Sequence, residues 1–178
     1  MHTGQAGKLF YMEQAIAIRQ ADLDDINTIG FLAQQIWPQA YGEILTTAQI
    51  AYMLQLMYNP TSLKDQMTKQ RHQFLVVELD DEPVGFASFS NTGKNGLFKL
   101  HKLYVLPNIQ GKGLGKALIN AVLDEIRPLG ATALQLGVNR RNKAISFYEK
   151  SGFSIIAEKD TDIGNGYLMT DYIMEKKL

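Results

Sequence analysis

The most constraining feature of the sequence is a glycine-rich loop between an apolar strand and an amphipathic helix. Gly111, Gly113 and Gly115 come after the strand-like run 103–106, with four residues between the run and Gly111, and apolar residues then recur at helical spacing. At a helix start several backbone N–H groups lack partners, the helix dipole is positive, and glycines let a ligand approach. The loop therefore predicts a phosphate cradle, and a tight turn that merely uses glycine is an equally good explanation of the loop on its own.

The spacing of the glycines does not fit the two commonest phosphate loops. A Walker A loop requires G-x-x-x-x-G-K-[ST] and a dinucleotide-binding loop requires G-x-G-x-x-G, and the sequence contains neither pattern. The preceding strand is also the third of a predicted meander, whereas a dinucleotide-binding loop follows the first strand of a βαβ unit. The loop therefore indicates a different fold.

Hydrophobic periodicity predicts one domain that contains both helices and strands. The first helix is expected to stop at Pro38, because proline interrupts the helical hydrogen bonds. The order of elements predicts a single α+β (mixed α/β) domain over residues 15–178, built on one large, partly antiparallel sheet. Predicted strands cover 15–21, 74–79, 84–91, 97–106, 133–138, 153–158 and 168–175, and predicted helices cover 26–37, 46–59, 62–69, 112–126 and 142–150.

Composition removes several classes of function. The chain has 178 residues, with 18 basic and 18 acidic side chains and no cysteine. This neutral balance lacks the basic field expected for binding to nucleic acid or to an anionic membrane surface. Without cysteine there is no thiol nucleophile, and the three histidines do not have metal-ligand spacing, so no metal is expected. No apolar run is long enough to span a bilayer, so the expected location is cytoplasmic.

A second motif lies about 30 residues after the glycine loop, where 144–153 reads A-I-S-F-Y-E-K-S-G-F. Together with Q-x-x-G-x-G at 110–115, this run resembles the GCN5-related N-acetyltransferase (GNAT) superfamily, whose pyrophosphate loop is Q/R-x-x-G-x-G/A. The resemblance is strong over 73–153, and the order of elements extends it back to residue 15. The layout is similar to that of bacterial polyamine-type acetyltransferases. One departure is that Arg141 stands seven residues before Tyr148, where many members have Asn, while Asn142 stands at six.

The resemblance implies a mostly antiparallel, twisted sheet of about seven strands, with helices on both faces and a splayed strand pair at the cofactor site. It also implies acetyl-CoA as co-substrate. Pantetheine would lie between the strand that ends at Val105 and the strand 133–138, and its amides would pair with the backbone of Leu103 and Val105. Lys112 and Lys116 would offset phosphate charge, or are simply solvated helix lysines. The implied cofactor-binding residues are Leu103, Tyr104, Val105, Gln110, Gly111, Lys112, Gly113, Leu114, Gly115, Lys116 and Asn142.

Two residues are candidate proton carriers. By resemblance the Tyr148 hydroxyl lies near the CoA sulfur, and we expect it to act as the general acid that protonates the leaving thiolate. His101 stands where relatives often carry Glu, and a neutral imidazole suits a general base near pH 7, directly or through water. Strand alternation predicts that His101 shares a face with Leu103 and Val105. A structural histidine, with water as the base, is an open alternative.

Two functions remain open at this point. One is an enzyme that transfers an acetyl group directly to a primary amine of a polyamine-like small molecule or a peptide. The other is a non-catalytic acyl-CoA-binding regulatory module of the same fold, and the intact Tyr148 favours the enzyme. The expected partner is an amine substrate, with no nucleic acid and no membrane, and a homodimer stays open. Candidate acceptor contacts are Trp37, Tyr41, Tyr52, Tyr58, Glu43, Asp160 and Asp162, each of which core packing or solvation also explains.

The first residues of the chain show no helical or strand period. We expect residues 1–14 to be a poorly ordered extension, and translation to start at Met1 or at Met12.

Overall fold

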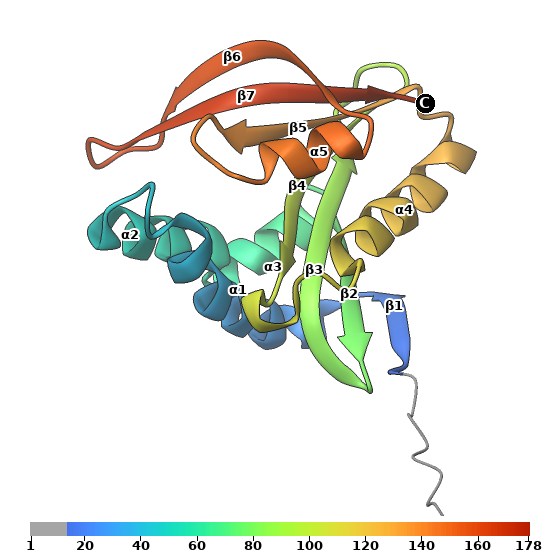
Figure 1. Ribbon diagram of the computed structural model, residues 1–178, viewed down its shortest axis with the longest axis horizontal. Coiled ribbons are helices and arrows are strands. Elements are labelled where there is room, and N and C mark those ends of the chain that lie inside the picture. Colours follow the sequence, from blue (N-terminus) through green and yellow to red (C-terminus); the bar gives the residue numbers. More distant parts are fainter. Residues whose placement is uncertain (1–13) are drawn as a thin grey trace, which may run out of the picture.

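The structure, a computed structural model, describes residues 14–178, which form a seven-stranded sheet in the order β1-β2-β3-β4-β5-β7-β6 (Figure 1). The strands are β1 (Ile16–Gln20), β2 (Gln73–Leu79), β3 (Glu82–Asn91), β4 (Leu97–Val105), β5 (Ala133–Asn139), β6 (Ser154–Asp162) and β7 (Leu168–Lys177). The α-helices are α1 (Ile26–Tyr41), α2 (Thr47–Tyr58), α3 (Pro60–Thr68), α4 (Leu114–Ile126) and α5 (Ile145–Lys150), and short 3-10 helices cover Leu23–Asp25, Pro107–Ile109 and Arg127–Leu129.

The sheet is antiparallel at every pairing except one. β4 and β5 run parallel, and they pair only from Leu97–Leu100 to Ala133–Leu136. Beyond that point the strands separate, so the β5-facing backbone groups at the end of β4 have no ladder partner in β5. The predicted splayed strand pair is therefore confirmed, and it lies in the middle of the sheet.

Helices cover both faces of the sheet, as the resemblance implied. On one face α4 packs over β2 to β5, and the partly buried Ile145, Phe147 and Tyr148 of α5 join the same core. On the other face α1, α2 and α3 pack against Phe74, Val76 and Phe86. The parting of β4 and β5 thus lies between two separately packed layers of helices (Figure 1).

Two helices begin or end at residues other than those predicted. α1 continues through Pro38 to Tyr41, so the prediction that it stops at Pro38 is wrong. Proline lacks one N–H donor, but this loss falls in the last turn, where the Pro38 carbonyl still accepts the Gly42 N–H at 3.0 Å. α3 begins at Pro60 instead of Ser62, because the Asn59 side chain caps it by accepting the Ser62 N–H at 2.8 Å.

Within residues 14–178, no helix has the length and apolar character needed to cross a membrane. The prediction for residues 1–14 falls, apart from Gln14, outside the described residues.

Candidate active site

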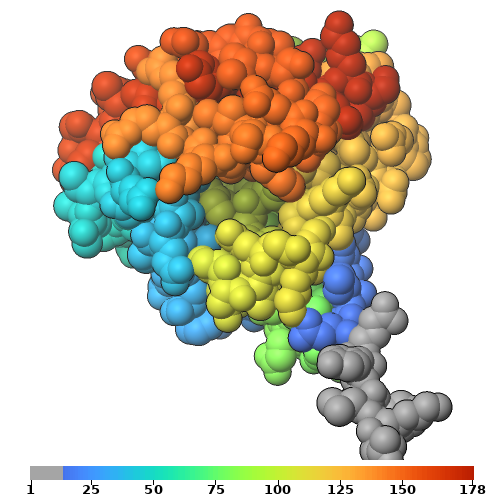
Figure 2. All heavy atoms as spheres, in the orientation of Figure 1, coloured from blue at the N-terminus to red at the C-terminus, as the bar shows by residue number. Residues whose placement is uncertain are grey.

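A cavity of about 810 Å³ lies where β4 and β5 part. Its walls come from β4, the glycine loop, the start of α4, the end of α1 and the segment around α5. In Figure 2 the hollow opens between these segments, with β4 visible at its floor. Every predicted cofactor-binding or catalytic residue lines this cavity except Lys112, whose ammonium donates to the Gln14 side chain instead.

The glycine loop presents free backbone donors to the cavity. Gly111 and Gly113 have φ angles of +87° and +75°, a conformation that side chains with a Cβ rarely adopt. Gly113 caps α4 without a side-chain hydrogen bond, and the N–H groups of 111–116 donate to no acceptor in the described part of the chain. Six adjacent donors at a positive helix end are suited to an anion. The Gln110 side chain anchors the loop by donating to the Val105 carbonyl at 3.3 Å.

The third glycine, Gly115, allows close packing between α4 and α5. A Cβ at Gly115 would lie 3.3 Å from the Phe147 ring, so the missing side chain lets α4 approach α5. Leu114 is buried beneath the loop, and Lys116 is exposed beside it. The two sequence motifs therefore meet in space at Gly115 and Phe147.

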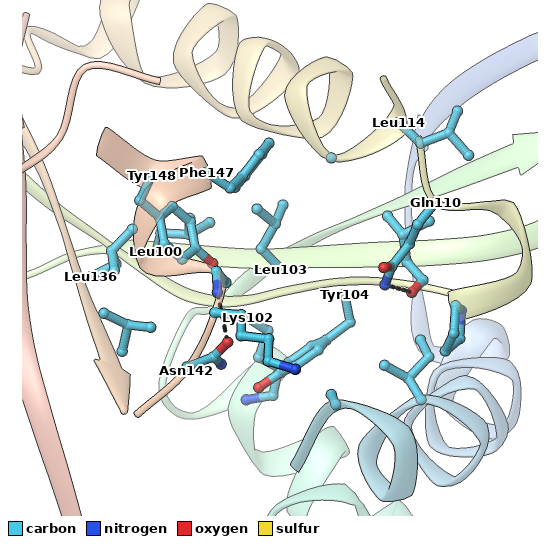
Figure 3. Close-up of a pocket in the computed structure, with 18 of the residues that line it drawn as sticks. Leu100, Lys102, Leu103, Tyr104, Gln110, Leu114, Leu136, Asn142, Phe147 and Tyr148 are labelled. Atoms are coloured by element: carbon cyan, nitrogen blue, oxygen red, sulfur yellow. Dashed lines mark hydrogen bonds between the residues drawn. The ribbon is translucent and has the colours of Figure 1, made fainter. Parts of the chain in front are cut away.

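A β-bulge in β4 changes which side chains face the cavity. Ser88 of β3 pairs with Lys102 and Phe89 pairs with Leu100, which leaves His101 as the extra residue. Leu103 therefore stays on the face of α4, while Lys102 and Tyr104 turn toward α1 (Figure 3). The side chain of Val105 is buried in the core, whereas those of Leu103 and Tyr104 are partly buried and also line the cavity beside the backbone of this segment.

The prediction that His101 shares a face with Leu103 and Val105 is wrong, because the bulge breaks the alternation. Nε2 of His101 lies 2.8 Å from the Ser90 hydroxyl, and the ring stacks on His72 at 3.8 Å on the opposite face. Burial lowers the pKa of His101 to about 3. The ring is therefore neutral near pH 7 but is a much weaker base than the ordinary imidazole expected from the sequence.

Tyr148 enters the cavity from α5. Its ring packs edge-on against Phe147 and Phe153, with centroids 5.4 and 5.8 Å away. Burial raises the pKa of the Tyr148 hydroxyl well above its ordinary value, so the group keeps its proton. Asn142 also lines the cavity, and its side-chain oxygen accepts the Ala144 N–H at 2.8 Å, which orients the chain entering α5.

A second, smaller cavity of about 90 Å³ adjoins the first. The two cavities share Tyr41, His101, Lys102, Tyr104 and Gly137, so they meet at the β4–β5 parting. Of the predicted acceptor contacts, Trp37, Tyr41 and Tyr58 line the smaller cavity. The other four contact protein groups and line neither cavity: Tyr52 donates to the Ile163 carbonyl, Glu43 pairs with Lys143, Asp160 pairs with Arg140, and Asp162 accepts the Gly164 N–H.

Two charged residues of the smaller cavity were not singled out from the sequence. Lys102 reaches it from β4 and Asp171 from β7. Each has apolar residues on at least one side in the sequence, since Leu103 follows Lys102 and Tyr172-Ile173-Met174 follows Asp171, which is a signal that the sequence does contain. The side chain of Asp171 packs on Gly137, since a Cβ at that glycine would lie 3.3 Å from its carboxylate oxygen.

Comparison with known proteins finds related sequences and a similar fold. A family model described as an acetyltransferase (GNAT) domain matches residues 43–176. An uncharacterized N-acetyltransferase of Mycobacterium tuberculosis is 29% identical over 157 residues, covering 88% of this chain and 99% of the relative. The spermidine N(1)-acetyltransferase of Thermoplasma acidophilum is 27% identical over 168 residues, covering 92% and 98%. The crystal structure of the PaiA N-acetyltransferase from the same organism in complex with coenzyme A superposes with a TM-score of 0.79 at 27% identity, covering 92% of this chain and 99% of that one.

Proposed function

Because the chain belongs to the GNAT acetyltransferase family and is an N-acetyltransferase, we propose that it transfers the acetyl group of acetyl-CoA directly to a primary amine of a small molecule or a peptide. The observation that carries this proposal is the large cavity at the parting of β4 and β5, with the free donors of the glycine loop at its rim. A relative that was crystallised with coenzyme A has the same fold.

The proposed cofactor site uses backbone groups more than side chains. The N–H groups of 111–116 would hold the pyrophosphate, because they are free and lie at the start of α4. The unpaired edge of β4 around Leu103 and Val105 would pair with the pantetheine amides, as an added strand does. Of the two loop lysines, Lys116 lines the cavity and would offset phosphate charge, whereas Lys112 is paired with Gln14.

The proposed reaction needs one nucleophile and three proton transfers. The acceptor ammonium first loses a proton, and the amine then attacks the thioester carbon, so that an N–C bond forms and the C–S bond breaks. Tyr148, which is protonated, would give its proton to the departing thiolate. The phenolate then recovers a proton from the new amide nitrogen. The overall reaction yields an N-acetyl product, free CoA and one proton.

Two side chains are candidates to accept the proton that the acceptor ammonium loses. His101 lines both cavities, but its low pKa and its contact with Ser90 favour a positioning role over that of a base. Asp171 packs on Gly137, where the two cavities meet, and burial raises the pKa of its carboxyl. A carboxylate whose pKa is raised is the better proton acceptor of the two.

A screen of thiol release tests the proposal. Acetyl-CoA is mixed with the protein and with polyamines, amino acids, aminoglycosides and peptide N-termini, and free thiol is measured against a no-acceptor control. The proposal expects acceptor-dependent release for at least one class. A protein that binds coenzyme A but releases no thiol with any acceptor would instead be the non-catalytic module.

A further inference from the structure

A buried cation at the smaller cavity has no anionic partner. Only 8% of Lys102 is exposed, and its ammonium lies 5.3 Å from the centre of the Tyr58 ring and 5.8 Å from that of Phe74. Across residues 14–178, the side chain of Lys102 forms no ion pair and no hydrogen bond, although its backbone pairs with β3. Lys102 lines both cavities, and a charge in a largely apolar cavity without a partner is poorly solvated, which aromatic faces compensate only in part. The site therefore favours a ligand that carries a negative charge.

An anion lies at the same cavity, on the other side of β5. Asp171 comes from β7 and Lys102 from β4, which are the two strands that flank β5 in the sheet. Asp171 packs on Gly137, and Gly137 lines both cavities. The carboxylate is thus placed at the junction with the large cavity, where an acceptor amine must arrive to meet the thioester.

The remaining lining of the smaller cavity is largely apolar, and its main contributors are Trp37, Met53, Met57, Leu168 and Met169. A volume of about 90 Å³ corresponds to roughly six to nine water molecules at about 10–15 Å³ each. That size admits a small molecule of similar atom count, either a short polyamine or an amino acid. The charges distinguish between the two, because a second ammonium would be repelled by Lys102.

We propose that the acceptor is a small α-amino acid with an apolar side chain. Asp171 holds its ammonium at the junction of the cavities, Lys102 binds its carboxylate, and the methionine and tryptophan surface receives its side chain. This inference rests on the proposed acetyl transfer and narrows its substrate class. It departs from the polyamine acceptor that the sequence layout suggested.

Trp37 provides a direct binding assay, because it is the single tryptophan of the chain and lines the cavity. Its fluorescence is titrated, in the presence of CoA, with L-leucine, L-leucinamide, isoamylamine and spermidine. The first three share a side chain and differ at the carboxylate, which is present, neutralised as an amide, or absent. We expect L-leucine to bind at least about tenfold more tightly than the other three ligands.

Two variants test whether the Lys102 ammonium causes the preference for L-leucine over L-leucinamide. Lys102→Met keeps the length of the side chain and removes its charge, and it should abolish the difference between L-leucine and L-leucinamide. Lys64→Met removes an exposed lysine of α3 and should leave the difference unchanged. Circular dichroism of both variants confirms folding. An unchanged preference in Lys102→Met, or spermidine binding as tightly as L-leucine to the wild type, overturns the proposal.

The binding assay and the turnover assay test the amino acid inference and the proposed acetyl transfer separately. If the protein does not transfer acetyl groups, no acceptor releases thiol, yet the fluorescence order of the four ligands can still be read. If the protein transfers acetyl groups to spermidine with a higher kcat/KM than to L-leucine, the proposed function stands and the amino acid inference falls.

Discussion

Valine substitutions at two glycines distinguish the stability cost of backbone strain from a loss of coenzyme A binding. Gly113 of the loop has a φ of +75°, and Gly93 of the β3–β4 turn has a φ of +80°. A Cβ at either position meets no atom within 4 Å. Valine at either site therefore suffers the same left-handed strain, about 1–3 kcal/mol, without a clash. For a chain of this size that loss lowers the Tm by about 2–12 °C.

Only one of these variants should lose coenzyme A. At Gly113 the added side chain fills the space in front of the free N–H groups, so we expect the Kd for CoA to rise at least about tenfold, about 1.4 kcal/mol. Gly93→Val lies away from the cavity and should keep the wild-type Kd. Isothermal titration calorimetry gives the affinity, and thermal unfolding confirms similar stability losses. Equal CoA affinity in both folded variants would refute the assignment of this loop.

Three further predictions concern titratable groups. Tyr148→Phe keeps the ring packing and should lower kcat by about 10²-fold with unchanged CoA affinity, and wild-type turnover when chemistry limits the rate would contradict the acid role. His101→Gln should leave the pH profile of kcat/KM the same as in the wild type between pH 6 and 8, because the pKa of His101 is about 3, and loss of a limb near pH 6.5 would contradict this. Lys102→Met should raise the free energy of unfolding at pH 7 by about 3 kcal/mol, since burial lowers the lysine pKa from 10.5 to about 8. The unfolded chain keeps the lysine proton up to pH 10.5, so this group's contribution to wild-type stability rises between pH 8 and 10.5. The difference in unfolding free energy between Lys102→Met and the wild type should therefore shrink over that range. A difference that stays constant with pH in urea titrations would contradict the lowered pKa.

Much of the site could be predicted because its signals are local. The glycine loop and the A-I-S-F-Y-E-K-S-G-F run each carry their own chemistry, and the structure brings them together where Gly115 contacts Phe147. The meander of β2, β3 and β4 and the amphipathic helices follow from the period of apolar residues.

What the sequence did not reveal depends on contacts between distant segments. The bulge at His101 exists only relative to Ser88 and Phe89 of β3, so alternation along β4 could not place the imidazole. Asp171 approaches the reaction site because β7 inserts beside β5, out of chain order. α1 passes Pro38 because the missing donor falls in the last turn, which depends on where the helix ends.

The central claim is direct transfer of the acetyl group from acetyl-CoA to an amine at the parting of β4 and β5. Rapid-quench mass spectrometry with carbon-13-labelled acetyl-CoA and the acceptor that gives the fastest thiol release follows three species: free CoA, the labelled N-acetyl product and the intact protein. We predict that free CoA and labelled product appear together, at equal rates, while the mass of the protein stays unchanged. A labelled protein that forms before the product, or release of CoA without any labelled amine, would contradict the account.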